Sequence, residues 1–162
     1  MPAQSPFPPL DTHLADRSRE QRWSAPDEPT LLLADSVETA RAELAARFQR
    51  DRHPELAPLL QERTIFSIEL TLERIFDLTD AAVIDGLAIS NAPGCFADRA
   101  AARATAGFLR HVRGAQGIVV PSLALPANPA HWNLVVFLER IPSLEAVVTN
   151  LEPADTFQLD SG

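Results

Sequence analysis

Residues Arg22 to Glu43 read R-W-S-A-P-D-E-P-T-L-L-L-A-D-S-V-E-T-A-R-A-E, and the rest of the chain is arranged around this stretch. An arginine and a tryptophan precede a proline-containing turn, and the apolar run Thr30–Ala34 follows. A short continuous apolar run is typical of a strand buried on both faces. The residues after it predict a helix that carries Glu43 on its second turn. We therefore expect a cation, an apolar strand and a carboxylate in one neighbourhood.

The helix predicted after this strand starts with Asp35, a suitable N-cap, and Glu38 can close a capping box with it. Glu43 lies on the flank of the apolar face of this helix. A flank carboxylate can face a ligand while the helix stays packed. The apolar face itself consists of residues that recur at helical spacing, namely Val37, Ala40, Leu44 and Phe48.

Further along the chain, hydrophobic patterning predicts strands at 64–72, 74–78, 117–120 and 133–138, and an edge strand at 144–149. One helix is predicted from a cap at Thr79 to about Leu87. Another is predicted over residues 99–112, with Gly114 as its C-cap. The inward face of this second helix is expected to consist of Ala101, Thr105, Phe108, Leu109 and Val112. About six strands and three helices in mixed order indicate an α+β domain with a twisted, mixed, partly antiparallel sheet.

The length of 162 residues suits a single folded domain. We expect a proline-rich, extended segment at 1–21, the domain at 22–149 and an acidic, mobile tail at 150–162. The net charge of −8 argues against direct binding of nucleic acid. No apolar run is long enough to span a membrane, and no signal peptide is evident. The single cysteine, Cys95, fits a reducing compartment, so a cytoplasmic location is expected.

Metal or thiol chemistry has little support in the sequence. The histidines are scattered, and no pair has the spacing of metal ligands, so no metal site is predicted. His131, beside Trp132 in a predicted loop, is interpreted as a packing or surface residue. Cys95 has no neighbouring histidine or aspartate pattern that would activate it, and a lone cysteine usually behaves as a small hydrophobic residue.

Several short segments resemble, in the same order, the segments of a known family. They are Arg22-Trp23, Leu31 to Ala34, Ser36 to Glu43, Phe76 to Asp80, Gly117 to Ser122, and Asn133 to Phe137. The chain thereby resembles the RES domain family, the NAD-consuming toxins of bacterial RES–Xre toxin–antitoxin pairs. The resemblance covers roughly residues 22–138 and implies an ADP-ribosyltransferase-like α+β fold in a bacterial protein.

The resemblance implies that NAD is bound as a substrate and that its nicotinamide–ribose bond is cleaved. Glu43 would stabilise the positive charge that develops on the ribose, and Ser122 would orient the ribose or the carboxamide. Arg22 would hold the pyrophosphate through paired hydrogen bonds. These side chains are expected to line one pocket. The other contacts implied for the ligand are Trp23, Leu32, which would lie in the wall of the pocket, and Asn133.

The chain departs from the family on the side that would bind the ligand. Leu32 stands where the family has a tyrosine, and the chain contains no tyrosine. Glu20, Gln21 and Ser24 replace the glycines and asparagine that normally flank the arginine–aromatic pair. One hypothesis is therefore an enzyme that cleaves NAD as a glycohydrolase, a phosphorylase or an ADP-ribosyltransferase. The other is a catalytically degenerate binding module of the same fold.

The family also suggests a partner for either hypothesis. This partner is an Xre-like helix-turn-helix antitoxin that plugs the ligand site. The sequence leaves the oligomeric state open, with a homodimer as one arrangement.

Overall fold

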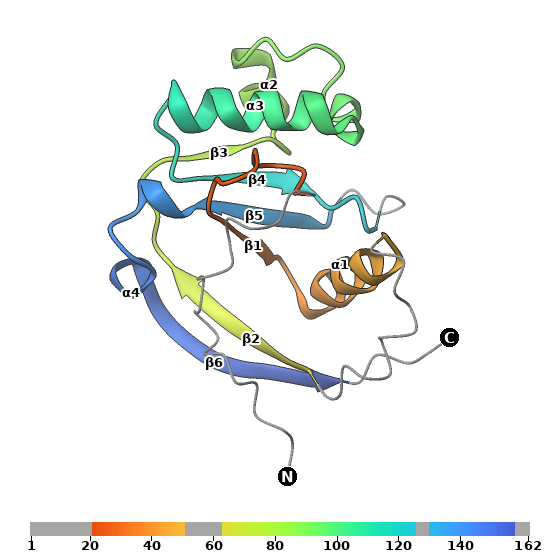
Figure 1. Ribbon diagram of the computed structural model, residues 1–162, viewed down its shortest axis with the longest axis vertical. Helices are drawn as coiled ribbons and strands as arrows, with labels where there is room; N and C mark the ends of the chain where they lie inside the picture. Colours follow the sequence, from red (N-terminus) through yellow and green to blue (C-terminus); the bar gives the residue numbers. More distant parts are fainter. Residues whose placement is uncertain (1–20, 51–62, 126–129, 158–162) are drawn as a thin grey trace.

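The computed structural model describes residues 21–50, 63–125 and 130–157 (Figure 1). Its strands are β1 (Thr30–Ala34), β2 (Arg63–Leu70), β3 (Ile75–Asp77), β4 (Gly117–Pro121), β5 (Trp132–Phe137) and β6 (Val148–Phe157). Its helices are α1 (Val37–Arg50), α2 (Ala81–Gly86), α3 (Arg99–His111) and α4 (Leu144–Val147). Short 3-10 turns occur at Gly94–Ala97 and Leu138–Arg140. The α+β class predicted from the sequence is confirmed.

Four strands form a sheet in the order β1-β5-β4-β3. The sheet is mixed, as predicted from the sequence. β5 is antiparallel to both β1 and β4, whereas β3 and β4 are parallel. Gly117 starts β4 at a point where it lies very close to the backbone of β5. A Cβ atom there would lie 2.9 Å from the carbonyl oxygen of Val135, so a larger residue would not fit without a shift. The central strands are buried on both faces, which explains why their sequences are continuous apolar runs.

One face of this sheet is covered by α3, the 3-10 turn before it and the segment before β1, which passes beneath α3 in Figure 1. The inward face of α3 includes Ala102 and Ala106, whose small side chains let this part of the helix lie close to the sheet. Gly114 follows the helix with φ of 65°, so the predicted C-cap position does adopt the left-handed conformation. The core on this side includes Trp23, Phe96, Ala102, Ala106, Leu109, Ile118, Val120, Val135 and Phe137.

The opposite face packs against α4 and the end of β2, with Val136, Leu144 and Val147 in a second core cluster. β2 and β6 form a separate antiparallel ribbon that arches along the side of the molecule away from α3 (Figure 1). The β2 residues alternate as predicted, with Phe66 and Ile68 partly covered and polar neighbours exposed. Among the described residues, no helix is long and apolar enough to cross a membrane.

The C-terminal part of the chain differs from the sequence prediction. The edge strand expected at 144–149 is replaced by helix α4, and Ser143 caps it by accepting a hydrogen bond from the backbone N–H of Ala146. Strand β6 then runs from Val148 to Phe157, through much of the stretch expected to be a mobile acidic tail from residue 150. Its backbone pairs with β2 along its whole length, so acidic side chains do not prevent an ordered strand here.

Two helix starts also differ from their predictions. Helix α1 is capped by Ser36 rather than Asp35, because the Ser36 hydroxyl accepts the backbone N–H of Thr39 at 3.2 Å. Helix α2 is capped by Asp80 rather than Thr79. The hydroxyl of Thr79 instead donates to Asp77, at the end of β3.

The sequence predicted only in part which residues of α3 face the sheet and how deeply α1 is buried. Leu109 is buried as expected, but Phe108 and Val112 are exposed, because Ala102 and Ala106 face the sheet in their place. In α1 the predicted apolar residues Val37, Ala40 and Leu44 are half-buried, and the side chain of Phe48 lies outside the described residues. The most buried side chain described in that helix is Thr39.

Candidate functional site

Three predicted site residues from distant parts of the chain meet in one hydrogen-bonded group. The hydroxyl of Ser122 donates to Glu43 Oε1 at 2.8 Å, and Asn133 Nδ2 donates to the same oxygen at 2.6 Å. Ser122 and Asn133 are each only 4% exposed. Glu43 comes from α1, Ser122 follows β4, and Asn133 lies at the start of β5. A carboxylate with two donors on one oxygen is fixed in position.

The register of the sheet explains how this group forms. Asn133 lies opposite Val120 on one side and Ala34 on the other, so its side chain shares a face of the sheet with both. Ser122 is two residues beyond Val120 and follows the same face. Its backbone N–H donates to the carbonyl of His131 at 3.0 Å, which continues the β4–β5 ladder past the end of β4. The chain direction after β1 brings α1, and with it Glu43, to this edge.

Two acceptor atoms in the group have no partner in the described part of the chain. Both donors bind Glu43 through Oε1, and within the described residues no hydrogen bond involves Oε2. Asn133 Oδ1 is buried and makes no hydrogen bond. A buried acceptor without a donor is costly, and such atoms in native proteins call for an explanation. Together, these oxygens could accept hydrogen bonds from a ligand that carries hydroxyl or amide donors.

Arg22 and Trp23, both predicted to contact the ligand, have structural contacts at the start of α3. Arg22 Nη1 donates to the carbonyls of Phe96 at 3.0 Å and Ala97 at 2.7 Å. Trp23 is 7% exposed and meets the ring of Phe96 edge to face at a centroid distance of 5.2 Å. Glu43, Ser122 and Asn133 are thus brought together, whereas the contacts of Arg22 and Trp23 described here are with the turn before α3.

Leu32 lies on the outer strand of the sheet, on the same face as Asn133. It pairs with Val135, and residues two apart along β5 point to the same side. Leu32 is 48% exposed, which is unusual for a leucine in the middle of a strand otherwise covered on this face. An exposed apolar side chain near Asn133 is suited to contact a ligand.

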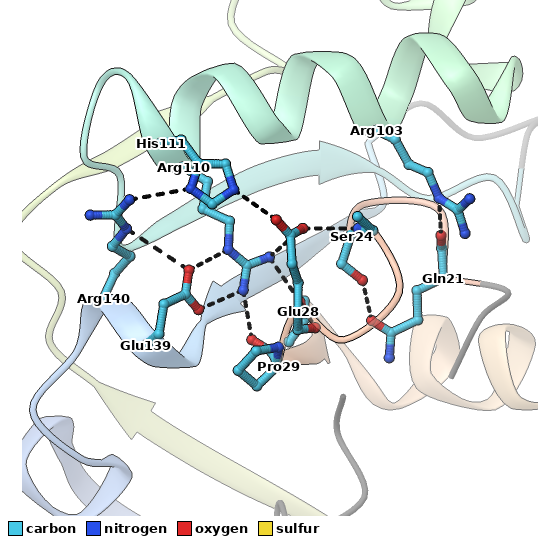
Figure 2. A network of polar contacts seen from close by, with 11 residues as sticks. Gln21, Ser24, Glu28, Pro29, Arg103, Arg110, His111, Glu139 and Arg140 are labelled. Carbon is cyan, nitrogen blue, oxygen red and sulfur yellow. Dashed lines mark hydrogen bonds and ion pairs between the residues drawn. The ribbon is translucent and has the colours of Figure 1, made fainter. Parts of the chain in front are cut away.

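A buried arginine network holds the segment that leads into β1 (Figure 2). Arg110 of α3 is fully buried, and its guanidinium lies 4.5 Å from the centroid of the Phe137 ring. Its nitrogens donate to both carboxylate oxygens of Glu139, to the carbonyl of Pro29 at 2.8 Å and to the Thr30 hydroxyl at 3.2 Å. The network therefore fixes where β1 begins relative to α3 and β5.

Glu28 joins this network from the segment before β1. Its Oε1 lies 2.7 Å from His111 Nε2, and its Oε2 accepts the backbone N–H of Ala25 at 2.9 Å and lies 3.4 Å from Arg110 Nη1. Burial acts to raise the pKa of Glu28, but these hydrogen bonds and the charges of Arg110 and His111 outweigh it and hold the pKa below 4.5. In Glu139, burial is likewise outweighed by the contacts with Arg110, so its pKa is also lowered.

At the other end of α3, Arg103 ties down the beginning of the same segment. Arg103 Nε donates to the carbonyl of Gln21 at 3.0 Å, and the Ser24 hydroxyl donates to the side chain of Gln21 at 2.5 Å. Figure 2 shows these contacts at the opposite end of the segment from Arg110. Sequence reasoning missed both anchors, since it expected the inward face of α3 to be apolar and gave no role to Arg103 or Arg110.

A second contact between α1 and the start of β5 was also missed. Thr39 Oγ1 and His131 Nδ1 are 2.8 Å apart, next to the Glu43 group. His131 was interpreted as a packing or surface residue, and its side chain is indeed packed, being only 13% exposed, but its polar contacts with Asp35 and α1 were not predicted. Spacing offers a signal in retrospect, because Thr39 is four residues before Glu43 and His131 is two before Asn133.

A hollow of about 240 Å³ lies elsewhere, between α3 and the segment after α2. It contains none of the predicted site residues. Phe108 lies in the wall of this hollow and is exposed, because Ala102 and Ala106 face the sheet in its place. Its lining is mostly apolar and consists of Leu87, Ile89, Ala104, Thr105, Phe108 and Leu109.

The mixed sheet, with the Glu43 carboxylate of α1 held near the end of β4 and the start of β5, fits the α+β domain that the family resemblance implies. The model of the RES domain family matches residues 3–160, and the chain belongs to this family. The fold is similar to the MbcT toxin in the crystal structure of the M. tuberculosis MbcT–MbcA toxin–antitoxin complex, with a TM-score of 0.65 and 19% sequence identity. That match covers 99% of this chain and 81% of the other. A search of curated proteins gives no match.

Proposed function

We propose that this protein binds NAD and cleaves its nicotinamide–ribose bond, with Glu43 and Ser122 as the catalytic residues. The observation that carries the proposal is the Glu43 carboxylate, held through Oε1 by Ser122 and Asn133 while Oε2 makes no hydrogen bond within the described residues. A carboxylate fixed by one oxygen is preorganised to act with the other. Membership of the RES family and the similarity of the fold to the MbcT toxin support the same class of function.

The unpartnered acceptors fit the donor groups of NAD. The nicotinamide ribose carries hydroxyl groups, and the nicotinamide carries a carboxamide N–H₂. Glu43 Oε2 and the buried Asn133 Oδ1 can each accept a hydrogen bond from these groups. A donor that reaches Asn133 Oδ1 would satisfy an oxygen that is otherwise buried without a partner, so the site favours such a ligand over an apolar one.

In the proposed reaction the bond between ribose C1′ and the nicotinamide nitrogen breaks, and its electron pair leaves with nicotinamide. Positive charge then develops on C1′ and the ring oxygen of the ribose. The negative charge of Glu43 stabilises this transition state more than the ground state, which lowers the barrier. An acceptor, whether water, phosphate or a protein side chain, adds to C1′ and loses a proton. Ser122 holds Glu43 and orients the ribose.

The test is nicotinamide release from NAD by the purified protein, compared with a Glu43→Gln variant. Glutamine keeps an oxygen that can accept from Ser122 and Asn133, so the fold should be retained. It has no negative charge, so turnover should fall by about a hundredfold or more. Glu145→Gln is the matched control, because Glu145 is an exposed carboxylate on α4. Equal turnover in wild type and Glu43→Gln, or equal loss in the control, contradicts the assignment.

The alternative is a RES-fold binding module that has lost its chemistry and acts through a protein partner. Specific observations favour it: Leu32 offers no ring, and Nη1 of Arg22 is engaged by the Phe96 and Ala97 carbonyls. Trp23 is buried against Phe96. Three of the groups expected to grip NAD are thus either replaced or committed to the fold. A wild-type protein that folds but neither binds NAD nor releases nicotinamide would support this alternative.

Under either function we propose an Xre-like helix-turn-helix antitoxin as the partner, in the bacterial cytoplasm. The solved structure with the similar fold is a toxin–antitoxin complex, which supports this choice. Co-purification with the product of an adjacent helix-turn-helix gene is the direct test. If the two proteins form a complex and NAD turnover falls in it, the partner blocks the site. A complex with unchanged turnover would contradict occupation of the site by the partner.

A further inference from the structure

Helix α1 contacts the start of β5 through polar pairs on two successive turns. Thr39 and Glu43 are four residues apart and therefore lie on the same face of the helix. His131 directly precedes β5 and Asn133 is its second residue, and their side chains both reach α1. Thr39 Oγ1 lies 2.8 Å from His131 Nδ1, and Glu43 Oε1 accepts from Asn133 Nδ2 at 2.6 Å.

The Thr39–His131 pair is well shielded and has its own supporting contacts. Thr39 is fully buried, and its hydroxyl accepts a hydrogen bond from Ser36 at 3.1 Å. His131 Nδ1 also lies 3.5 Å from Asp35 Oδ2, and Nε2 lies 3.5 Å from Glu38 Oε2. The imidazole thus faces Asp35, which precedes the helix cap, with one nitrogen and Glu38, in the first turn of α1, with the other.

The backbone on both sides of His131 is fixed as well. Its carbonyl accepts the N–H of Ser122 at 3.0 Å, and the carbonyl of Trp132 accepts the N–H of Asp35 at 3.1 Å. His131 therefore connects the strand end that carries Ser122 to the helix that carries Glu43. In the described ranges, no group of three or more histidine, cysteine, aspartate or glutamate side chains is placed to hold a metal ion. A mechanical role is therefore a better explanation for His131 than a metal site.

We propose that Thr39 and His131 are positioning residues for Glu43. Their hydrogen bond lies one helical turn before the carboxylate and keeps α1 from sliding along its axis or rotating about it. Glu43 Oε1 thereby meets Ser122, and Oε2 faces the substrate. This inference rests on the proposed NAD cleavage for its catalytic consequence, although the positioning itself is a property of the free protein. A displacement of the catalytic group by about 1 Å can cost about a hundredfold in rate.

The test uses the full chain and matched substitutions at both positions. Thr39→Val removes the hydroxyl and keeps the shape, whereas Thr39→Ser keeps the hydroxyl and removes a methyl group. His131→Ala removes the imidazole, whereas His131→Asn places an amide nitrogen near the position of Nδ1. Thr39→Val and His131→Ala should each lower kcat for nicotinamide release about tenfold to a hundredfold. KM should change less than about threefold, and Thr39→Ser and His131→Asn should restore most of the loss.

The double variant Thr39→Val/His131→Ala should lose no more than about threefold beyond either single variant, because both remove the same contact. A readout that does not need turnover is the side-chain amide NMR signal of Asn133, whose Nδ2 donates to Glu43. This signal should shift in Thr39→Val and His131→Ala but stay near its wild-type position in Thr39→Ser. Glu43→Ala provides the reference for the unbonded amide.

The outcomes separate this inference from the proposed function. If wild type releases no nicotinamide, the proposed function fails, and the Asn133 signal still decides whether Thr39 and His131 position Glu43. If kcat per folded molecule and the Asn133 signal are unchanged in Thr39→Val and His131→Ala while only the melting temperature falls, the contact is merely structural. Additive losses of kcat in the double variant would also overturn the proposal, since the two residues would then act separately.

Discussion

Leu32 is the residue at which this chain departs most clearly from its family, and its setting predicts what a tyrosine there would do. The side chain is 48% exposed on the same face of the sheet as Asn133. An aromatic ring at this position could stack on a ligand base, a contact worth roughly 1–3 kcal/mol. Leu32→Tyr should therefore raise NAD affinity or turnover by about ten- to a hundredfold. Calorimetric NAD titration and nicotinamide release, with wild type beside the variant, measure it.

The control for this substitution is Ile75→Tyr. Ile75 is 43% exposed and lies on β3, the opposite outer strand of the same sheet. A tyrosine there adds the same exposed ring away from Asn133, so NAD binding should not change. If Leu32→Tyr folds normally and gains neither binding nor activity, the ligand site has been lost more broadly. The binding-module alternative would then be the better account of the protein.

Arg110 makes a different kind of prediction, because its effect is on stability. It is fully buried and donates to Glu139, to Pro29 and to the Thr30 hydroxyl. Arg110→Met keeps most of the apolar volume but removes the main cationic partner of Glu139, which is partly exposed and is then left with Arg140 at 3.8 Å. The free energy of unfolding should fall by about 3 kcal/mol, the lower end for a broken buried pair. Urea denaturation, with the midpoint and slope fitted together, measures this loss.

Arg113→Met is the matched control for Arg110. Arg113 is exposed just after α3 and lies 5.4 Å from the centroid of the Phe76 ring, a contact worth about 1 kcal/mol or less. A loss in this variant as large as that in Arg110→Met would show that the buried network adds nothing beyond removal of a charge.

Among the helices and strands, those with one dominant pattern were predicted and those with two plausible patterns were not. The apolar run before Asp35 predicted the position of β1 correctly but not its burial, because β1 is an outer strand and Leu32 is 48% exposed. The helix that carries Glu43 was predicted from spacing, whereas its meeting with Ser122 was expected from the family resemblance. Helix α3 has two candidate faces, since Phe108 and Val112 compete with the alanines and Leu109. Close approach of backbone to sheet favours the small residues, a tertiary effect that periodicity does not contain.

The missed helix α4 had a local signal, namely a serine cap followed by apolar residues three apart. Ser143 caps the helix, and Leu144 and Val147 are both buried. For the polar contacts of the site, the only signal was the spacing of Thr39 from Glu43 and of His131 from Asn133, which does not identify the partners. Neither Arg110 nor the Thr39–His131 pair could be predicted, because each joins segments separated by some 30 to 90 positions in sequence. Which residues meet at such a separation depends on the strand register, and no short stretch of the sequence determines that register.

The network that joins α3, β1 and the turn after β5 predicts how the fold responds to acid. The pKa values of Glu28 and Glu139 are below 4.5 in the folded protein. A carboxyl group with a lowered folded pKa stabilises the fold above its unfolded pKa, and this contribution is lost as the pH falls through the folded value. The melting temperature should therefore fall as the pH drops below about 4.5. Glu28→Gln and Glu139→Gln should each reduce this dependence, whereas Glu145→Gln should not.

Across the whole molecule, the candidate site depends on segments that begin near residue 21 and end near the turn after β5. The segment before β1 is anchored at both ends of α3, and β5 receives contacts from β1, β4 and α1. The site therefore belongs mainly to the four-stranded sheet and α1, whereas the β2–β6 ribbon packs on the opposite face through Leu70 and Val148 and reaches α1 through the exposed Arg41–Asp155 ion pair. Loss of the ribbon should thus affect folding before it affects the geometry around Glu43.

Truncation of the chain tests this division. A chain that ends after Thr149 keeps α4 but removes most of β6, so β2 loses its hydrogen-bonding partners from Glu69 back to Arg63. An unpaired strand with Phe66 and Ile68 on one face is a site for aggregation. We expect this variant to aggregate or to melt well below wild type, whereas a chain that ends after Phe157 keeps every β2–β6 pair and should melt like wild type. Light scattering and thermal melting distinguish them. Equal stability of the two truncated chains would mean that residues from 150 onward act as a dispensable tail after all.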